Sequence, residues 1–192
     1  MPILAQPAAT EMDSFYKLPE NIASPLIKHS FIEGRILCPL DHGKMLGDQL
    51  RSHRLNVDSN TSIENYTNTE WWAEQRNKNY DWVVASTGGL KDLTSYILKY
   101  GMAVAANGVA ILDRLSFLEP VKTRRDFLFS NKLSNLIVLS PRPTFHQLGG
   151  AKDSVTSAWL VFQHTGRWQD GCMMAYALNW GELAQLPELP IS

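Results

Sequence analysis

Short apolar runs alternate with helix-like segments along most of this 192-residue chain, and this alternation limits the fold more than any other feature. Runs such as YDWVVAS and SNLIVLS lack regular polar alternation, which is typical of strands buried on both faces of a sheet. Segments such as LKDLTSYILKYGMAVAA carry apolar residues at helical spacing. Alternating strands and helices form βαβ units, so we expect an α/β fold with a mostly parallel sheet and helices on both faces.

The last two predicted strands, SNLIVLS and SAWLVFQHT, depart from this alternation. The loop PRPTFHQLGGAKDSVT joins them without a helical pattern, so we expect a terminal antiparallel hairpin at one sheet edge. A chain of 192 residues suits one sizeable α/β domain. We place this domain at residues 13–165, after a flexible lead at 1–12 and before a C-terminal extension at 166–192 that packs on the domain or trails from it.

Composition and charge limit the classes of function. The net charge of −1 argues against a broad basic surface for nucleic acid but leaves room for a local basic patch. Two cysteines, Cys38 and Cys172, do not suggest a disulfide framework, and a reducing compartment is then the default. No apolar run has the length of a membrane span, and the start of the chain lacks a signal-peptide pattern. These features predict a cytoplasmic protein that does not associate with a membrane.

The strand YDWVVAS runs into a turn of small residues and then into a helix. In α/β proteins, functional sites lie in the crevice beyond the carboxyl ends of the strands. The turn, Ser86 to Gly89, carries no strong acid, base, thiol or aromatic ring. Small residues before a helix can bind an anion, but the phosphate-loop pattern of Gly, four residues and Gly-Lys-Ser/Thr is absent. A catalytic loop, or one that has lost its chemistry, is therefore the stronger interpretation.

DWVVASTGG stands where phage and bacterial DNA adenine-N6 methyltransferases often show Asp-Trp-Val-Val-x-Asn-Pro-Pro-Phe, and it fits that place without a gap. Upstream, FYKLPENIASPLI resembles their Tyr-x-Thr-Pro cofactor segment, and ILCPLDHGKML stands where a Glu-Pro and Gly-x-Gly loop is expected. Downstream segments resemble their later strands and loops: GVAILDRLSFLEPVKTRRDFL, LIVLSPRPTF and DSVTSAWLVF. Over residues 13–165 the chain thus resembles the class I S-adenosylmethionine-dependent methyltransferases, which implies their Rossmann-like fold.

The resemblance implies a pocket for S-adenosylmethionine after the first two strands. Asp58 would accept the ribose hydroxyls, although a capping or turn aspartate is an equally good explanation. The loop after the first strand keeps one glycine, and the bulky His42 and Lys44 beside it would crowd a ligand. Residues of the leading segment would close over the methionine end of the cofactor, or simply pack. The candidate cofactor-binding residues are Tyr16, Pro19, Pro39, Asp41, Gly43 and Asp58.

Cys38 stands where the family has a glutamate, and His42 follows four residues later. Thiolate and imidazole are zinc ligands, but two of them without further partners are weak evidence for a metal. No metal site is predicted.

The resemblance assigns the catalytic loop to Ser86, Thr87, Gly88 and Gly89. Methyl transfer to a base amine depends on aiming the nitrogen lone pair rather than on a strong base. Ser86 replaces the family's Asn and can still accept a hydrogen bond, whereas Thr87 and Gly88 replace two rigid prolines. Gly89 replaces the aromatic ring, so a stacking contribution of about 1–3 kcal/mol is missing. Together with the altered cofactor loop, these changes predict weak or no adenine methylation.

Basic residues gather on the presumed substrate side of the fold. The segment KTRRDF contains Lys122, Arg124 and Arg125, and the long loop between the last two predicted strands contains Arg142. These side chains would contact nucleic-acid phosphates, but a solvated helix face also explains the first segment. The long loop is either a target-contacting loop or lid, or a plain hairpin connection.

Two functions remain open. We favour a methyltransferase fold kept as a binding or regulatory module, a pseudoenzyme whose partner is DNA or another protein. The alternative is an active S-adenosylmethionine-dependent methyltransferase that acts on a nucleic-acid base amine. The resemblance to phage proteins suggests a phage or a mobile element as the setting. The chain has no sizeable separate target-recognition domain, which argues against a complete restriction-modification enzyme.

Overall fold

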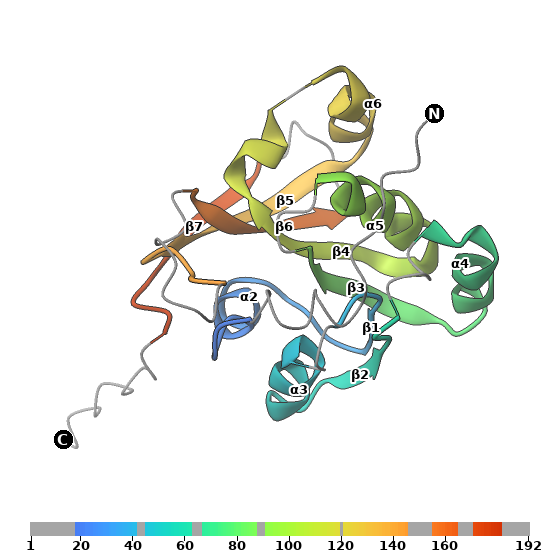
Figure 1. Cartoon of the computed structure of the whole chain (residues 1–192), viewed down its shortest axis with the longest axis horizontal. Helices are drawn as coiled ribbons and strands as arrows, with labels where there is room; N and C mark the ends of the chain where they lie inside the picture. The colour runs from blue at the N-terminus through green and yellow to red at the C-terminus, as the bar shows by residue number, and fades with distance from the viewer. Residues whose placement is uncertain are drawn as a thin grey trace.

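The computed structural model describes residues 18–41, 45–62, 67–87, 91–119, 121–145, 155–164 and 171–181. They form one sheet with helices on both faces (Figure 1). The helices are α2 (Ser24–His29), α3 (Met45–Ser52), α4 (Thr69–Arg76), α5 (Lys91–Val104), the 3-10 helix η3 (Leu115–Leu118) and α6 (Lys122–Ser130). The strands are β1 (Arg35–Cys38), β2 (Asn56–Ser59), β3 (Tyr80–Ser86), β4 (Ala105–Arg114), β5 (Lys132–Ser140), β6 (Ser157–Gln163) and β7 (Met173–Leu178). None of the helices in these segments combines the length and apolar character that a bilayer span requires.

The strands lie in the order β2-β1-β3-β4-β6-β5-β7. Strand β6 runs antiparallel to both of its neighbours, and the other pairs are parallel. The α/β fold with a mostly parallel sheet is therefore confirmed, and so is the antiparallel pairing of the last two predicted strands. The position of that pair differs from the expectation, because β6 inserts between β4 and β5. Six of the seven residues of β6 are buried, which fits a central strand with a neighbour on each side.

Strand β7 lies in the C-terminal extension, which showed no strand pattern in the sequence. It pairs in parallel with β5 and forms an edge of the sheet. The sequence MMAYAL shows no alternation of polar and apolar residues, because both faces of the strand are apolar. On this strand Ala177 is buried, and the exposed large apolar side chains are Met173, Met174, Tyr176 and Leu178. The extension is thus attached to the sheet through residues 173–178.

The core has two apolar layers, one on each face of the sheet. Successive residues of a strand point to opposite faces, and β3 supplies both layers in this way. Val83 and Ala85 pack with the apolar side chains of α5, whereas Trp82 and Val84 pack with those of α2 and α3. The continuous apolar run of YDWVVAS therefore buries both faces, as its lack of polar alternation predicts.

The two adjacent tryptophans in the polar segment after β2 act as packing residues. Asn68 begins α4 by accepting hydrogen bonds from the backbone N–H groups of Glu70 and Trp71. Trp72 is buried and stacks on Tyr100 of α5, with ring centroids 5.9 Å apart. Helix α4 is thus fixed against α5 by an aromatic contact rather than by a long apolar stripe.

Candidate functional site

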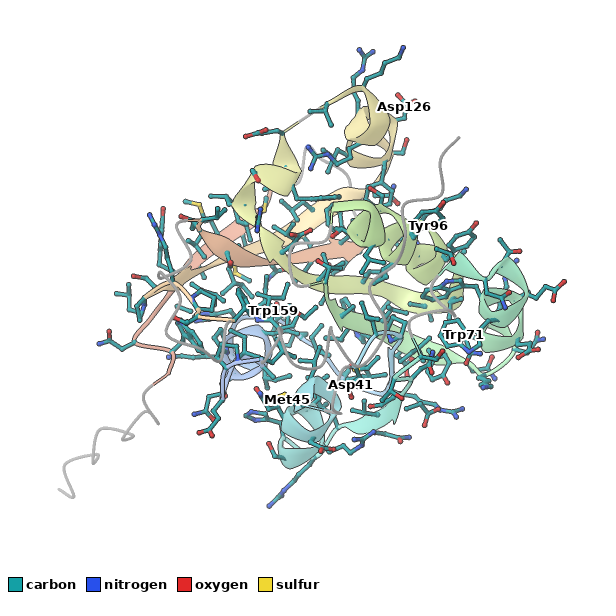
Figure 2. The ribbon with its side chains drawn as sticks, in the orientation of Figure 1. Asp41, Met45, Trp71, Tyr96, Asp126 and Trp159 are labelled. Atoms are coloured by element: carbon teal, nitrogen blue, oxygen red, sulfur yellow. The ribbon has the colours of Figure 1, made fainter. Side chains whose placement is uncertain are left out.

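Four parallel strands bring their carboxyl ends to one edge of the sheet, where most of the predicted site residues lie. Strands β2, β1, β3 and β4 are consecutive in the sheet. Ligands of α/β folds bind in the crevice beyond this edge. The described residues there form two groups, one at the N-terminus of α3 and one at the end of β3. Figure 2 labels Asp41 and Met45, which mark the first group.

Asp41 precedes α3 and is fully buried, at 0% exposure. Its Oδ1 accepts a hydrogen bond from the backbone N–H of Leu46 (2.9 Å), and its Oδ2 accepts one from that of Gly47 (3.0 Å). The first N–H groups of a helix have no partner within the helix, and a negative charge there interacts favourably with the helix dipole. Asp41 therefore caps α3 from inside the fold.

The close approach of α3 to the end of β2 requires a glycine at position 47. A Cβ atom on Gly47 would collide with Ser59 Oγ and with the carboxylate of Asp41. Arg51 holds the same elements together, because its guanidinium donates to the carbonyl of Val57 (3.0 Å) and to Ser59 Oγ (2.9 Å). The N-terminus of α3 is thus seated tightly against β2.

The other candidates of the cofactor loop are only partly described. The carbonyl of Pro19 accepts a hydrogen bond from Gln49 Nε2 (2.9 Å), so the leading segment packs on α3. Pro39 is buried directly after β1. Tyr16 and Gly43 lie outside the described residues. The roles of these residues in cofactor binding remain predictions.

Cys38, at the end of β1, is fully buried. Burial raises the pKa of its thiol well above the ordinary value, and the nearby Asp41 carboxylate acts in the same direction. The thiol is therefore neutral and a poor ligand. His42 lies outside the described residues, and within the described part of the chain no three His, Cys, Asp or Glu residues gather as a metal site would require.

Asp58 lies one residue before the carboxyl end of β2. Its Oδ2 accepts hydrogen bonds from the Arg35 guanidinium (2.7 Å) and from the Tyr80 hydroxyl (2.9 Å). Both partners are the first residues of parallel strands, β1 and β3, so this oxygen is directed away from the carboxyl edge. Binding of a ribose by Asp58 remains a prediction.

Tyr80→Phe is expected to raise the pKa of Asp58. Burial acts to raise this pKa, but hydrogen bonds from Tyr80 and Arg35 outweigh it and hold the pKa below its ordinary value. The stability contributed by Asp58 is thus complete above about pH 3.9 and is lost as pH falls through the lower folded pKa. Because the Asp58 side chain is 42% exposed, we expect the loss in Tyr80→Phe to stay below about 1 kcal/mol.

The measurement is an NMR titration of the Asp58 carboxyl group in the wild type and in Tyr80→Phe. Tyr176→Phe serves as the control, because it removes a tyrosine hydroxyl from β7, at the opposite edge of the sheet from Asp58. An Asp58 titration curve that is identical in all three proteins would contradict the assignment.

The described half of the predicted catalytic loop is buried against β4. Ser86 and Thr87 are each 2% exposed. Ser86 pairs with Leu112, and the N–H of Thr87 donates to the carbonyl of Leu112 (3.5 Å), which extends the strand pairing by one residue. Gly88 and Gly89 lie outside the described residues. Neither Ser86 nor Thr87 is presented to solvent.

A buried chain of hydrogen bonds joins Thr87 to two residues that follow it in sequence. Thr94, in the first turn of α5, is 0% exposed, and its Oγ1 lies 3.1 Å from Thr87 Oγ1. The same hydroxyl is hydrogen-bonded to Asp113 Oδ2, near the carboxyl end of β4. Asp113 Oδ1 accepts the N–H of Arg114 (2.6 Å). The chain therefore ties β3, α5 and β4 together at the candidate site.

A threonine hydroxyl has a single proton to donate, so the protonation of Asp113 decides which group donates in each of these hydrogen bonds. With Asp113 ionised, Thr94 donates to the carboxylate and accepts from Thr87. With Asp113 protonated, the order reverses and Thr87 is free to donate elsewhere. Burial raises the pKa of Asp113, against the opposing effects of the Thr94 and Arg114 hydrogen bonds and of the Arg114 and Arg124 charges. The raised pKa therefore widens the pH range over which the reversed order holds.

Asp113 was not singled out in the sequence. The sequence does contain a signal for it, since Asp113 is a lone acid near the end of the apolar run GVAILDRL. An acid in that position either belongs to a functional site or is a buried hydrogen-bond partner of a residue in the site. Its actual partner, Thr94, is nineteen residues away and becomes a neighbour only through the pairing of β3 with β4.

The candidate nucleic-acid residues divide between two segments. Lys122 and Arg125 are exposed on α6, whereas the guanidinium carbon of Arg124 lies 4.9 Å from the centre of the Phe117 ring. Arg142 is exposed two residues after β5. Both segments follow the carboxyl ends of parallel strands and so belong to the same edge as the candidate site. Contact with nucleic acid remains a prediction.

No protein-family model and no curated protein matches this chain. A solved structure from Listeria monocytogenes, named as a candidate class I S-adenosylmethionine-dependent methyltransferase, matches it with a TM-score of 0.52. The match covers 93% of this chain and 69% of that one, at 10% sequence identity. The fold is that of the class I methyltransferases. At this identity the likeness concerns the fold alone, and the Rossmann-like class I methyltransferase fold expected from the sequence is thereby confirmed.

Proposed function

We propose that this chain is a relative of the S-adenosylmethionine-dependent DNA adenine-N6 methyltransferases with weak or no catalytic activity. In this proposal the methyltransferase fold serves in the cytoplasm as a binding or regulatory module for DNA or another protein. The proposal rests on one observation: the described polar groups at the carboxyl edge, named in the next sentence, already form hydrogen bonds with one another. Asp41 accepts hydrogen bonds from two N–H groups at the start of α3, and the Thr94 hydroxyl is hydrogen-bonded to both Thr87 and Asp113.

The described residues do not fit a bound S-adenosylmethionine well. The N–H groups of Leu46 and Gly47, at the start of α3, already have the Asp41 carboxylate as their partner. A ligand that needs these groups must displace charge-assisted hydrogen bonds, which are stronger than neutral ones. We therefore derive no step of a methyl transfer through this cofactor.

The substrate side supports the same proposal. A flipped base must reach the amino-group acceptor of the catalytic loop, and Ser86 and Thr87 are each only 2% exposed. Thr87 is also held by the Thr94 hydroxyl, so its side chain already has a partner inside the protein.

Methyl incorporation into DNA tests this proposal. The purified chain is incubated with S-adenosylmethionine carrying a labelled methyl group and with adenine-containing duplex and single-stranded DNA. We expect incorporation no greater than that of Ser86→Ala. Incorporation well above Ser86→Ala, with label on the adenine amino group, would overturn the proposal in favour of an active enzyme.

An active methyltransferase acting on a nucleic-acid base amine is the second candidate. It is favoured by three exposed basic side chains, which follow the carboxyl ends of β4 and β5: Lys122, Arg125 and Arg142. Such side chains suit phosphate contacts on the substrate side. The labelled-methyl experiment above distinguishes the two candidates directly.

A further inference from the structure

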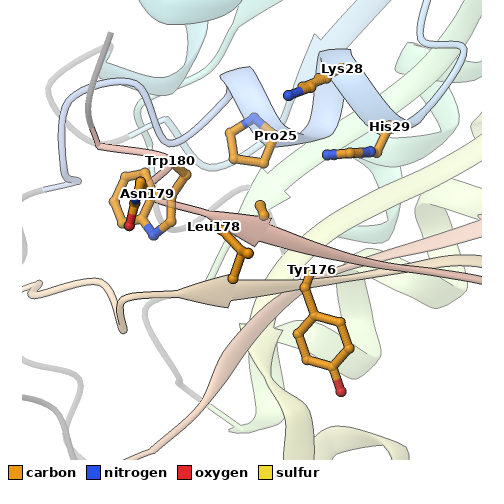
Figure 3. Close-up of a pocket in the computed structure, with 8 residues that line it drawn as sticks. Pro25, Lys28, His29, Tyr176, Leu178, Asn179 and Trp180 are labelled. Carbon is orange, nitrogen blue, oxygen red and sulfur yellow. The ribbon is translucent and has the colours of Figure 1, made fainter. Parts of the chain in front are cut away.

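A pocket of about 330 Å³ lies between α2 and the edge strand β7 (Figure 3). It is remote from the candidate site, because four strand spacings separate β3 from β7, or about 19 Å. Its apolar lining comes from Pro25 of α2 and from Ala177, Leu178 and Trp180 at the end of β7. This volume lies at the lower end of the range for small-molecule sites, about 300–1,000 Å³.

The walls of this pocket, hereafter the α2–β7 pocket, are fixed by hydrogen bonds at three points. Trp159 Nε1 donates to the carbonyl of Ile22 (2.9 Å) just before α2, and Asn135 Nδ2 donates to the carbonyl of His29 (2.9 Å) at its end. Trp180 Nε1 donates to the carbonyl of Pro141 (2.7 Å) and so holds the indole ring as a wall. A pocket with fixed walls binds a ligand at a smaller entropic cost than a pocket that must order on binding.

The charge of the α2–β7 pocket is positive. Lys28 and His29 line it, and no acid lies among its described lining residues. Burial, together with the neighbouring Lys28, lowers the pKa of His29, so its ring is neutral at pH 7 and Lys28 supplies the charge. The pocket thus presents one positive charge beside an apolar surface.

We propose that the α2–β7 pocket binds a small organic monoanion, a carboxylate carried on a flat apolar body. Lys28 pairs with the carboxylate and the His29 ring contributes a hydrogen bond, while Trp180, Ala177 and Pro25 cover the apolar body. A single carboxylate matches the single positive charge. This inference goes beyond the proposed function and does not depend on it, because none of the lining residues is among the candidate cofactor-binding, catalytic or nucleic-acid-binding residues.

The test uses indole-3-acetate and the uncharged indole-3-acetamide as probes, followed by two-dimensional ¹H–¹⁵N NMR of the full chain. We expect the carboxylate to shift the backbone resonances of Ala177 and Asn179 and the indole N–H of Trp180. We expect the amide to bind about tenfold more weakly, because it lacks the charge-assisted contact. Lys28→Gln should weaken binding of the carboxylate by about tenfold and leave the amide unchanged.

Lys99→Gln is the matched control, because Lys99 is an exposed lysine on α5, on the other face of the sheet. The same spectra report whether each variant remains folded. The proposal is overturned by an absence of shifts at carboxylate concentrations of about 10 mM. It is also overturned by equal affinity for the acid and the amide, or by equal behaviour of Lys28→Gln and Lys99→Gln.

Discussion

Asp41→Ala is expected to lower the free energy of unfolding by about 3 kcal/mol. The change removes two charge-assisted hydrogen bonds and leaves the N–H groups of Leu46 and Gly47 without their acceptors inside the fold. For a chain of this size, the expected fall in Tm is roughly 6–12 °C. Urea denaturation followed by circular dichroism measures the change in free energy.

Two further variants isolate the cap. Asp41→Asn keeps one side-chain oxygen as an acceptor, so its loss should be about half as large. Asp48→Ala removes an acid from the same helix that is exposed and pairs with Arg51, and it should cost less than about 1 kcal/mol. If Asp41→Ala cost no more than Asp48→Ala, Asp41 would not be the cap of α3.

Thr94→Val has the second large expected effect, a loss of about 2–3 kcal/mol at pH 8. Valine is similar in size but has no hydroxyl, so the buried carboxylate of Asp113 loses a donor and Thr87 loses its partner. The raised pKa of Asp113 means that the folded protein binds this proton more tightly than the unfolded chain does. The contribution of Asp113 to the free energy of unfolding therefore falls as pH rises from about 4 through the raised pKa of the folded state.

The loss in Thr94→Val should accordingly be smaller near pH 4, where a protonated Asp113 is less costly to bury. Thr94→Ser keeps the hydroxyl and serves as the control, with an expected cost of about 1 kcal/mol for the lost methyl group. In a double-mutant cycle with Asp113→Asn, the two changes should be coupled by at least about 1 kcal/mol. Strictly additive losses that do not vary with pH would contradict the hydrogen-bond chain.

The sheet was predictable from the sequence wherever a strand has a strong apolar run. YDWVVAS buries both faces of β3, and SAWLVFQ does the same for β6, so each is visible without knowledge of its partners. Strand β7 was not predictable because every residue of MMAYAL is apolar or aromatic, so its exposed positions give no polar face in the sequence. The insertion of β6 between β4 and β5 is a property of the whole sheet, and no local pattern encodes it.

The candidate site was predictable in position but not in chemistry. Ser86 and Thr87 follow the carboxyl end of a buried strand, as the sequence indicates. The partners that occupy the site come from elsewhere in the chain: Asp41 binds residues five and six positions later, and Asp113 reaches Thr94 across a strand pair. A single sequence shows each acid but not the N–H group or hydroxyl that it meets.

Calorimetric titration of the chain with S-adenosylmethionine and with its demethylated product measures whether the fold still binds the cofactor. We expect no measurable heat, or a Kd weaker than about 1 mM, because Asp41 already occupies the N–H groups of Leu46 and Gly47 among the described residues of the carboxyl edge. A Kd near 1 µM, with NMR shifts of the Leu46 and Gly47 amides, would contradict it, because the ligand would then have displaced Asp41 from the N-terminus of α3.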